Sequence, residues 1–264
     1  PNWVYGAEYL RSQYGFKIVT DYMDDFTKGL FGEYLDFEDH YFKMRSLQYE
    51  WIRFTLGYAR SNLWFNSGMV YWMFNDCWPA FMGWALVDYY LRPKSGYYAL
   101  QHFGKPISAY IEKIDNEYQL HVSGILENNT ACDLRVSVLN METNQLRTVL
   151  AEKTTVCANV ASRSLEMQLD TNEILIAEVS TEDYTVRNWY REGAPKLAKT
   201  DATVYQEADD GVELQAVRYV HIVEIEGVEA PSDNYFSLLP GEKRKIQFNK
   251  CTGSELEINS YTFA

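Results

Sequence analysis

The sequence predicts a multidomain protein in which the last part of an α/β barrel precedes two β-sandwiches. Six of the seven tryptophans lie before residue 85, in a stretch whose apolar residues recur at helical spacing. After about residue 107 the pattern changes to short alternating runs of Val, Ile, Leu and Thr separated by turn-forming residues. We therefore expect three domains, at residues 1–106, 107–194 and 195–264.

Two helices and one strand are expected in the first domain. A helix is predicted over residues 36–61, because four apolar side chains share one face at steps of four, three and four: Leu47, Trp51, Phe54 and Tyr58. Residues 69–74 form a run of six apolar side chains, which is typical of a parallel strand buried on both faces. A second helix is expected over residues 96–104. This α–β–α order is that of the last unit of an α/β barrel.

The rest of the chain is predicted to be all β. Alternating apolar residues indicate strands at 118–122, 134–138 and 175–179, with turn signals such as Asp115-Asn116 between them. A linker is expected over residues 192–196. A second series of strands follows it, around Val204 and residues 212–214, 219–225, 245–248 and 256–258. Each series is long enough for one small sandwich.

Charge and composition exclude several classes of function. The formal net charge of −13 disfavours a nucleic-acid backbone as partner. No apolar run approaches the roughly 18 residues of a membrane-spanning helix. The four cysteines are widely spaced, so we expect buried or half-buried thiols rather than a zinc site. We expect no cofactor and no bound metal.

Three segments resemble the C-terminal part of glycoside hydrolase family 2, most closely its β-mannosidase branch, with the exo-β-glucosaminidase branch as an alternative. Residues 68–79 read G-M-V-Y-W-M-F-N-D-C-W-P and are similar to the family's last barrel strand. Trp84, Asp88, Tyr89, Lys94 and Tyr97 match the spacing of the stretch that leads into its last barrel helix. Residues 232–242 read S-D-N-Y-F-S-L-L-P-G-E and resemble a motif of its terminal immunoglobulin-like domain.

The resemblance implies a (β/α)8 TIM barrel followed by two immunoglobulin-like β-sandwiches. It implies a retaining exo-β-glycosidase, in which one Glu attacks the sugar and another protonates the leaving oxygen. Both would lie upstream of Pro1, so we expect the chain to be the C-terminal part of a longer enzyme and to be inactive alone. Residues 12–16, S-Q-Y-G-F, are similar to the family's nucleophile motif with Gln13 in place of Glu. A helix over residues 8–23 is the preferred interpretation of this stretch.

Three residues after the predicted strand are candidates for contact with substrate. Trp78 would lie just past the carboxyl end of the strand, which faces the active site of a barrel, and its indole could stack on a sugar ring. Asn75 and Asp76 could orient sugar hydroxyls or support the nucleophile, or they could end the strand through loop hydrogen bonds. Asp233-Asn234 could bind calcium or a sugar, but a turn with Asx capping is the preferred interpretation. Asn128-Asn129-Thr130 fits a glycosylation sequon and carries little weight.

The expected partners are a carbohydrate, namely a terminal β-mannoside or related β-glycoside, and the rest of the chain's own catalytic domain. We expect the sandwiches to brace the barrel. Whether they also form the interface of a homodimer stays open. The rival hypothesis is a stand-alone carbohydrate-binding or structural module. A bacterial origin is expected from the family branch, and the compartment stays open between the cytoplasm and secretion.

Overall fold

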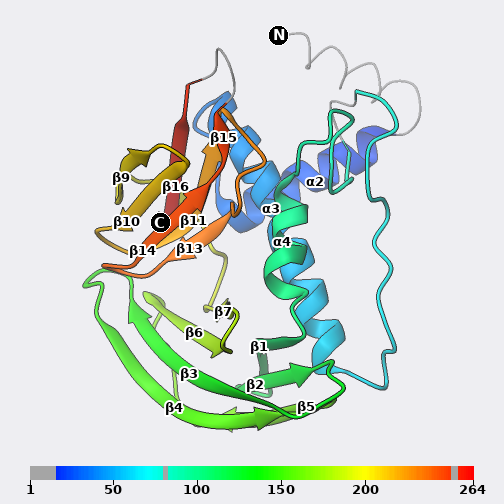
Figure 1. Cartoon of the computed structure of the whole chain (residues 1–264), viewed down its shortest axis with the longest axis vertical. Helices are drawn as coiled ribbons and strands as arrows, with labels where there is room; N and C mark the ends of the chain where they lie inside the picture. The colour runs from blue at the N-terminus through cyan, green and yellow to red at the C-terminus, as the bar shows by residue number, and fades with distance from the viewer. Residues whose placement is uncertain (1–15, 80–82, 251–254) are drawn as a thin grey trace. The chain divides into compact units, whose positions relative to one another are not determined.

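The computed structural model of the 264-residue chain describes residues 16–79, 83–250 and 255–264. Three helices and sixteen strands are assigned in these residues (Figure 1). The chain divides into two compact units that are interleaved in sequence. We call them the terminal unit, which holds Tyr71–Tyr98, Ala194–Ala264 and the described residues up to Tyr49, and the central unit, which holds Glu50–Val70 and Ala99–Gly193.

The helices are α2 (Phe16–Phe31), α3 (Phe37–Ser61) and α4 (Ser95–Phe103). Helix α2 ends at Gly32, whose φ of 85° and N–H bond to the carbonyl of Lys28 form a left-handed cap. Helix α3 begins where the Asp36 carboxylate accepts a hydrogen bond from the backbone N–H of Asp39, at 2.8 Å. The predicted helices over residues 36–61 and 96–104 are confirmed by α3 and α4. Of the predicted helix over residues 8–23, the structure describes only the part from Phe16 onward, which is helical in α2.

The face of α3 that the apolar spacing selected is not the buried one. Leu47 is buried, but Trp51, Phe54 and Tyr58 are each about half exposed, at 47%, 57% and 53%. Of the four side chains that share this face, only Leu47 is thus buried. Equal spacing places residues on a common face, whereas burial depends on what packs there, and in α3 Ile52 and Arg53 are the buried neighbours.

The central unit contains a β-sandwich. One sheet has the order β1-β2-β5, with β1 at Ile107–Ile114, β2 at Glu117–Gly124 and β5 at Val160–Leu165. The other has the order β4-β3-β6-β7, formed by Leu146–Val156, Thr130–Asn140, Glu173–Ser180 and Thr185–Tyr190. The hairpin between β1 and β2 turns at Asp115 and Asn116, both of positive φ, which confirms the predicted turn.

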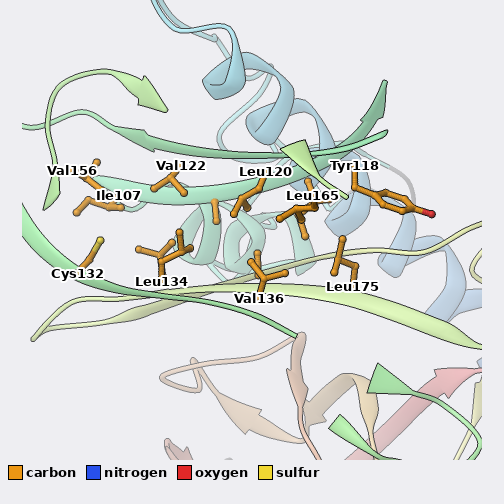
Figure 2. Packing of buried hydrophobic residues seen from close by; sticks show 14 of the residues in the cluster. Ile107, Tyr118, Leu120, Val122, Cys132, Leu134, Val136, Val156, Leu165 and Leu175 are labelled. Carbon is orange, nitrogen blue, oxygen red and sulfur yellow. The ribbon is translucent and has the colours of Figure 1, made fainter. Parts of the chain in front are cut away.

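The core of this sandwich lies between its two sheets. Figure 2 shows Leu120 and Val122 of one sheet pointing toward Leu134 and Val136 of the other. Every second residue of β2 and β3 enters this core, which is the alternation that the sequence shows. The predicted strands around residues 118–122, 134–138 and 175–179 are thereby confirmed.

The terminal unit contains a second sandwich. Its three-stranded sheet has the order β14-β10-β9, formed by Lys243–Gln247, Gly211–Ala216 and Thr203–Ala208. Its four-stranded sheet has the order β13-β11-β16-β8, formed by Phe236–Leu238, Val220–Glu226, Glu257–Phe263 and Leu197–Lys199. A two-stranded ribbon pairs β12 (Val228–Glu229) with β15 (Asn249–Lys250). The β-sandwich part of the predicted fold class is thus confirmed.

The first half of α3, up to Tyr49, covers the outer face of the four-stranded sheet of the terminal unit. Residues Val223 and Ile225 of the central strand β11 enter the sandwich core, so the residues that alternate with them face the other side. On that side the ring of Phe42 stacks on Tyr261 of β16, with centroids 3.5 Å apart and planes within 7°. The core therefore sits between the sheets, and the first half of α3 forms a third layer over one of them.

The predicted buried strand at residues 69–74 is wrong. None of these six residues is assigned to a strand, and Val70, Trp72 and Phe74 are exposed. The nearest regular pairing is an isolated parallel bridge between Asn75 and Val87. A strand buried on both faces needs a neighbouring strand at each edge, and the described residues place none beside this run.

Candidate functional site

The three predicted contact residues lie in one irregular stretch of the terminal unit. We call described residues 71–79 and 83–95 the Trp78 segment. Trp78 exposes 66% of its surface, and Asn75 is exposed as well. Asp76 is buried at 5% exposure, and its carboxylate Oδ2 lies 2.5 Å from Lys94 Nζ. The segment thus buries one carboxylate that is paired with a lysine, and it exposes an indole and an amide to solvent.

Backbone hydrogen bonds join the two passes of the segment, residues 71–79 and 83–95, and pair them in parallel where Asn75 meets Val87. The carbonyl of Phe74 accepts hydrogen bonds from the N–H groups of Leu86 and Val87, both at 3.0 Å. The N–H of Asp76 donates to the carbonyl of Val87, and that of Lys94 donates to Leu86, at 3.0 and 2.8 Å. These bonds fix the backbone on both sides of Asp76. The peptide bond between Trp72 and Met73 is cis.

A tight turn closes the second pass. The Asp88 carboxylate accepts hydrogen bonds from the N–H groups of Tyr90 and Arg92 and pairs with Arg92 Nε at 2.6 Å. Although partial burial opposes the charge, these bonds from Arg92 and Tyr90 lower the pKa of Asp88. The turn is therefore held by an ionised carboxylate at neutral pH.

Gln48 of α3 anchors the segment. Its amide nitrogen donates to the Tyr71 hydroxyl at 3.2 Å and to the carbonyls of Trp84 and Ala85 at 3.0 and 3.1 Å. Its amide oxygen accepts from the N–H of Gly96 at 3.4 Å and lies 3.2 Å from the Ser95 hydroxyl. One side chain therefore contacts both passes of the segment and the start of α4.

Gly83 allows the segment to close over Asp76. A Cβ at this position would lie 2.9 Å from Asp76 Oδ1 and 3.8 Å from Lys94 Nζ. Such a distance is shorter than van der Waals contact, so a larger residue would displace the carboxylate. Gly83 is therefore part of the site, although no spacing in the sequence singles it out.

Sequence reasoning found the exposed residues of the site and missed the residues that hold them. Tyr71 lies in the run predicted as a buried strand, yet its hydroxyl donates to the Trp84 carbonyl at 2.5 Å. Lys94 is indicated only by the resemblance, and no pattern in the sequence indicates Gln48. A polar residue on a helix carries no sign of its partners, and those of Gln48 lie 23 to 48 positions further along the chain.

The S-D-N-Y-F motif builds a turn at the edge of the terminal sandwich. The amide of Asn234 accepts from the N–H of Ile225 and donates to its carbonyl, both at 2.9 Å, and so pairs with β11 like a strand residue. Tyr235 follows with a φ of 57°, after which Phe236 and Leu238 enter the core. The preferred interpretation of Asp233-Asn234 as a turn is confirmed.

The described residues also bear on metal binding and on the cysteines. Among the described residues, no group of three or more His, Cys, Asp and Glu side chains is placed to hold a metal ion. Cys77, Cys132 and Cys157 are free thiols. Cys132 is buried, but Cys77 and Cys157 are exposed, so the expectation that these two thiols are buried or half-buried is wrong.

In the described part of the chain, no helix has the length and apolarity needed to cross a bilayer. Gln13 lies outside the described residues.

Relatives in sequence are β-mannosidases. The chain is 28% identical over 119 residues to β-mannosidase B of Aspergillus oryzae, a match that spans 39% of this chain and 14% of that protein. It is 30% identical over 90 residues to β-mannosidase B of Aspergillus flavus, across 29% of this chain and 10% of the relative. The matches thus span only about a tenth to a seventh of the length of these relatives. No family model matches the chain.

Solved structures share the fold over nearly the whole chain. The β-D-mannosidase of Dictyoglomus thermophilum superposes with a TM-score of 0.75 at 18% identity, covering 93% of this chain and 32% of that one. The exo-chitosanase CsxA of Amycolatopsis orientalis superposes with a TM-score of 0.63 at 16% identity, covering 91% and 36%. The predicted resemblance of this chain to the C-terminal part of a β-mannosidase-like glycoside hydrolase is therefore confirmed.

Proposed function

We propose that this chain is the C-terminal part of a retaining exo-β-glycosidase that removes terminal β-linked sugars, with β-mannosides as the preferred substrates. Similarity to β-mannosidase B in sequence and to a β-D-mannosidase in fold supports the substrate class. In this proposal residues 1–106 complete a TIM barrel begun upstream, and residues 107–194 and 195–264 form the two following sandwiches. Family 2 membership rests on the three motifs of residues 68–98 and 232–242.

One observation carries the proposal: an exposed indole lies close in the chain to a buried, ion-paired carboxylate. Trp78 is two positions from Asp76, which is buried and paired with Lys94 at 2.5 Å. An exposed aromatic ring suits the apolar face of a pyranose, and a backbone held in place beside it reduces the conformational entropy lost on binding. We assign the sugar contact to Trp78 and a hydrogen bond to a sugar hydroxyl to Asn75.

Asp76 takes a different role in this proposal. Its carboxylate lies inside the segment and is already engaged by Lys94, so it positions the neighbouring residues rather than contacting sugar. Asn75 supports this arrangement, because its amide donates to the carbonyl of Asp76 at 3.2 Å. The alternative in which Asp76 orders the loop is therefore the one we adopt.

The chemistry itself would come from two Glu residues upstream of this chain. In a retaining mechanism one attacks the anomeric carbon to form a glycosyl-enzyme, while the other protonates the leaving oxygen and then activates water. In this proposal the chain supplies a binding surface, and the nucleophile lies upstream. We therefore expect the purified chain to leave an aryl β-mannoside intact.

The test compares the 264-residue chain with a longer protein that also contains the sequence encoded upstream of Pro1. We expect the longer protein to hydrolyse an aryl β-mannoside and its Trp78→Ala variant to lose at least tenfold in kcat/KM. A Trp64→Ala variant, in the central unit, serves as the control. Hydrolysis by the purified chain above a mock preparation would contradict the proposal.

The same preparations test the rival binding module. The tryptophan of the β region, Trp189, already has the Arg53 guanidinium 4.1 Å from its ring centroid, which occupies one face that a sugar would need. Carbohydrate binding that survived deletion of residues 1–106 would nevertheless favour the module over the enzyme.

A further inference from the structure

The terminal sandwich and the Trp78 segment are both attached to the first half of α3. Phe42 and Tyr49 face the sandwich, where Phe42 stacks on Tyr261 and Tyr49 lies beside Tyr235, with ring centroids 6.3 Å apart. Gln48 faces the segment, as described above. The helix is thus the rigid element that connects the two.

A buried ionic cluster fixes α3 on the sheet. Arg45 Nη2 lies 2.9 Å from Glu224 Oε2, and Arg45 Nη1 lies 2.6 Å from Glu226 Oε1, both on β11. The Tyr235 hydroxyl donates to the other oxygen of Glu224 at 2.5 Å. Glu224 is 1% exposed, so this carboxylate has Arg45 and Tyr235 as partners in place of water. The motif tyrosine therefore sets the position of the carboxylate that holds α3.

The opposite side of the same helical turn reaches the segment. The backbone carbonyl of Arg45 accepts a hydrogen bond from the Ser95 hydroxyl at 2.7 Å. Ser95 follows Lys94, which pairs with Asp76, and Asp76 precedes Trp78 by two residues. A shift of α3 along the sheet would move the acceptors of Ser95 and the donors of Gln48 together.

We propose that Tyr235, Glu224 and Arg45 are positioning residues, through which the terminal sandwich holds the Trp78 segment in the geometry that receives the sugar. This inference rests on the proposed function for its substrate and on the contacts above for its mechanism. It gives Tyr235 of the motif a role at the candidate site, exerted through Glu224 and α3.

The first arm of the test needs no catalytic activity. In the full 264-residue chain, amide hydrogen exchange is measured at Leu86, Val87 and Lys94, whose N–H groups hold the segment together. We expect exchange at these sites to rise at least fivefold in Arg45→Met and Tyr235→Phe, while amides of β10 keep their protection. Arg45→Lys should restore most of the protection.

Matched controls separate positioning from general destabilisation. Glu213→Gln breaks an exposed pair with Lys243 in the same sandwich and should leave the segment unchanged. If Arg45→Met does not fold, Tyr235→Phe decides, because it removes a single hydroxyl. Unchanged exchange at the segment in a folded variant would overturn the proposal, and so would an equal rise across the sandwich core.

The second arm uses the longer enzyme and a double-mutant cycle. We expect Tyr235→Phe to lower kcat/KM for an aryl β-mannoside about fivefold and to raise the Ki of mannose-like competitive inhibitors equally, with kcat within twofold. In a Trp78→Ala background the same change should have no further effect on kcat/KM. Additive losses would overturn the role of Tyr235 in positioning Trp78. Absence of hydrolysis in the unmodified enzyme would instead overturn the proposed function, and the exchange data would still decide the positioning.

Discussion

Lys94 Nζ lies 2.5 Å from Oδ2 of Asp76, an aspartate that is 95% shielded from solvent. The two residues are 18 positions apart and come from opposite passes of the Trp78 segment. Since a buried carboxylate without a cation is strongly disfavoured, this pair ties the passes together. The pair explains why an irregular stretch with exposed aromatic residues keeps a defined backbone.

Removal of Lys94 should destabilise the chain. We expect Lys94→Met to lower the free energy of unfolding by about 2 kcal/mol, less than a fully buried pair would lose because the lysine is one-quarter exposed. Urea unfolding of the full chain measures the change. Arg92→Met, which breaks an exposed pair with Asp88, should cost less than about 1 kcal/mol. Equal losses in the two variants would contradict the assignment.

A second prediction concerns the contact between Gly83 and Asp76. Gly83→Ala should displace the Asp76 carboxylate, because the new Cβ would lie 2.9 Å from Oδ1, and we expect a loss of about 1 kcal/mol in stability. Gly68→Ala is the matched control, since no atom lies within 4 Å of a Cβ built there. Thermal unfolding of both variants checks the difference. A Gly83→Ala variant as stable as Gly68→Ala would show that the carboxylate has room to move.

The third prediction is a pH dependence of stability caused by Glu224. Burial raises the pKa of Glu224 to about 7, and the attraction of Arg45 offsets burial only in part. Glu226, Tyr235 and Glu38 also face this carboxylate, and the two glutamates add to the rise. The unfolded chain releases this proton near pH 4.5, whereas the folded chain keeps it until about pH 7.

The folded state therefore binds more protons between these two pH values. The contribution of Glu224 to the free energy of unfolding is complete below about pH 4.5. It is lost as the pH rises to about 7, and the loss is on the order of 3 kcal/mol at most. Urea unfolding at pH 5, 6, 7 and 8 measures the free energies of unfolding of the wild type and Glu224→Gln. The wild-type value should fall relative to that of the variant as the pH rises, and the difference should level off above about pH 7. The exposed-site variant Glu213→Gln should follow the wild type. Parallel profiles for wild type and Glu224→Gln would contradict the raised pKa.

The fourth prediction concerns the exposed aromatic face of α3. Trp51, Phe54 and Tyr58 are each about half exposed, and contiguous apolar surface of this kind favours association. We expect the purified chain to bind an apolar dye and to self-associate with rising concentration. Phe54→Glu combined with Tyr58→Glu should at least halve the dye signal. A monodisperse monomer in light scattering that binds no dye would contradict this expectation.

The strands and the first turn of the fold could be predicted from the sequence because their signals are local. Alternation around Leu120, Leu134 and Val138 depends only on the two-residue repeat of a strand, and each residue lies in the core. Asp115-Asn116 carries its own preference for positive φ, which the hairpin uses. The motif around Asn234 also forms its turn within a few residues, apart from its bonds to Ile225.

The sequence by itself determined the two β-sandwiches, the extents of α3 and α4, the resemblance to β-mannosidases and the position of Trp78 in the chain. Only the tertiary structure decided which face of α3 is buried, that residues 69–74 are not a strand, and that Asp76 is paired while Trp78 is exposed. The reason is physical. Backbone periodicity is set by neighbours along the chain, whereas burial and ion pairing depend on partners that folding brings together, as with Arg45 and Glu224, 179 positions apart.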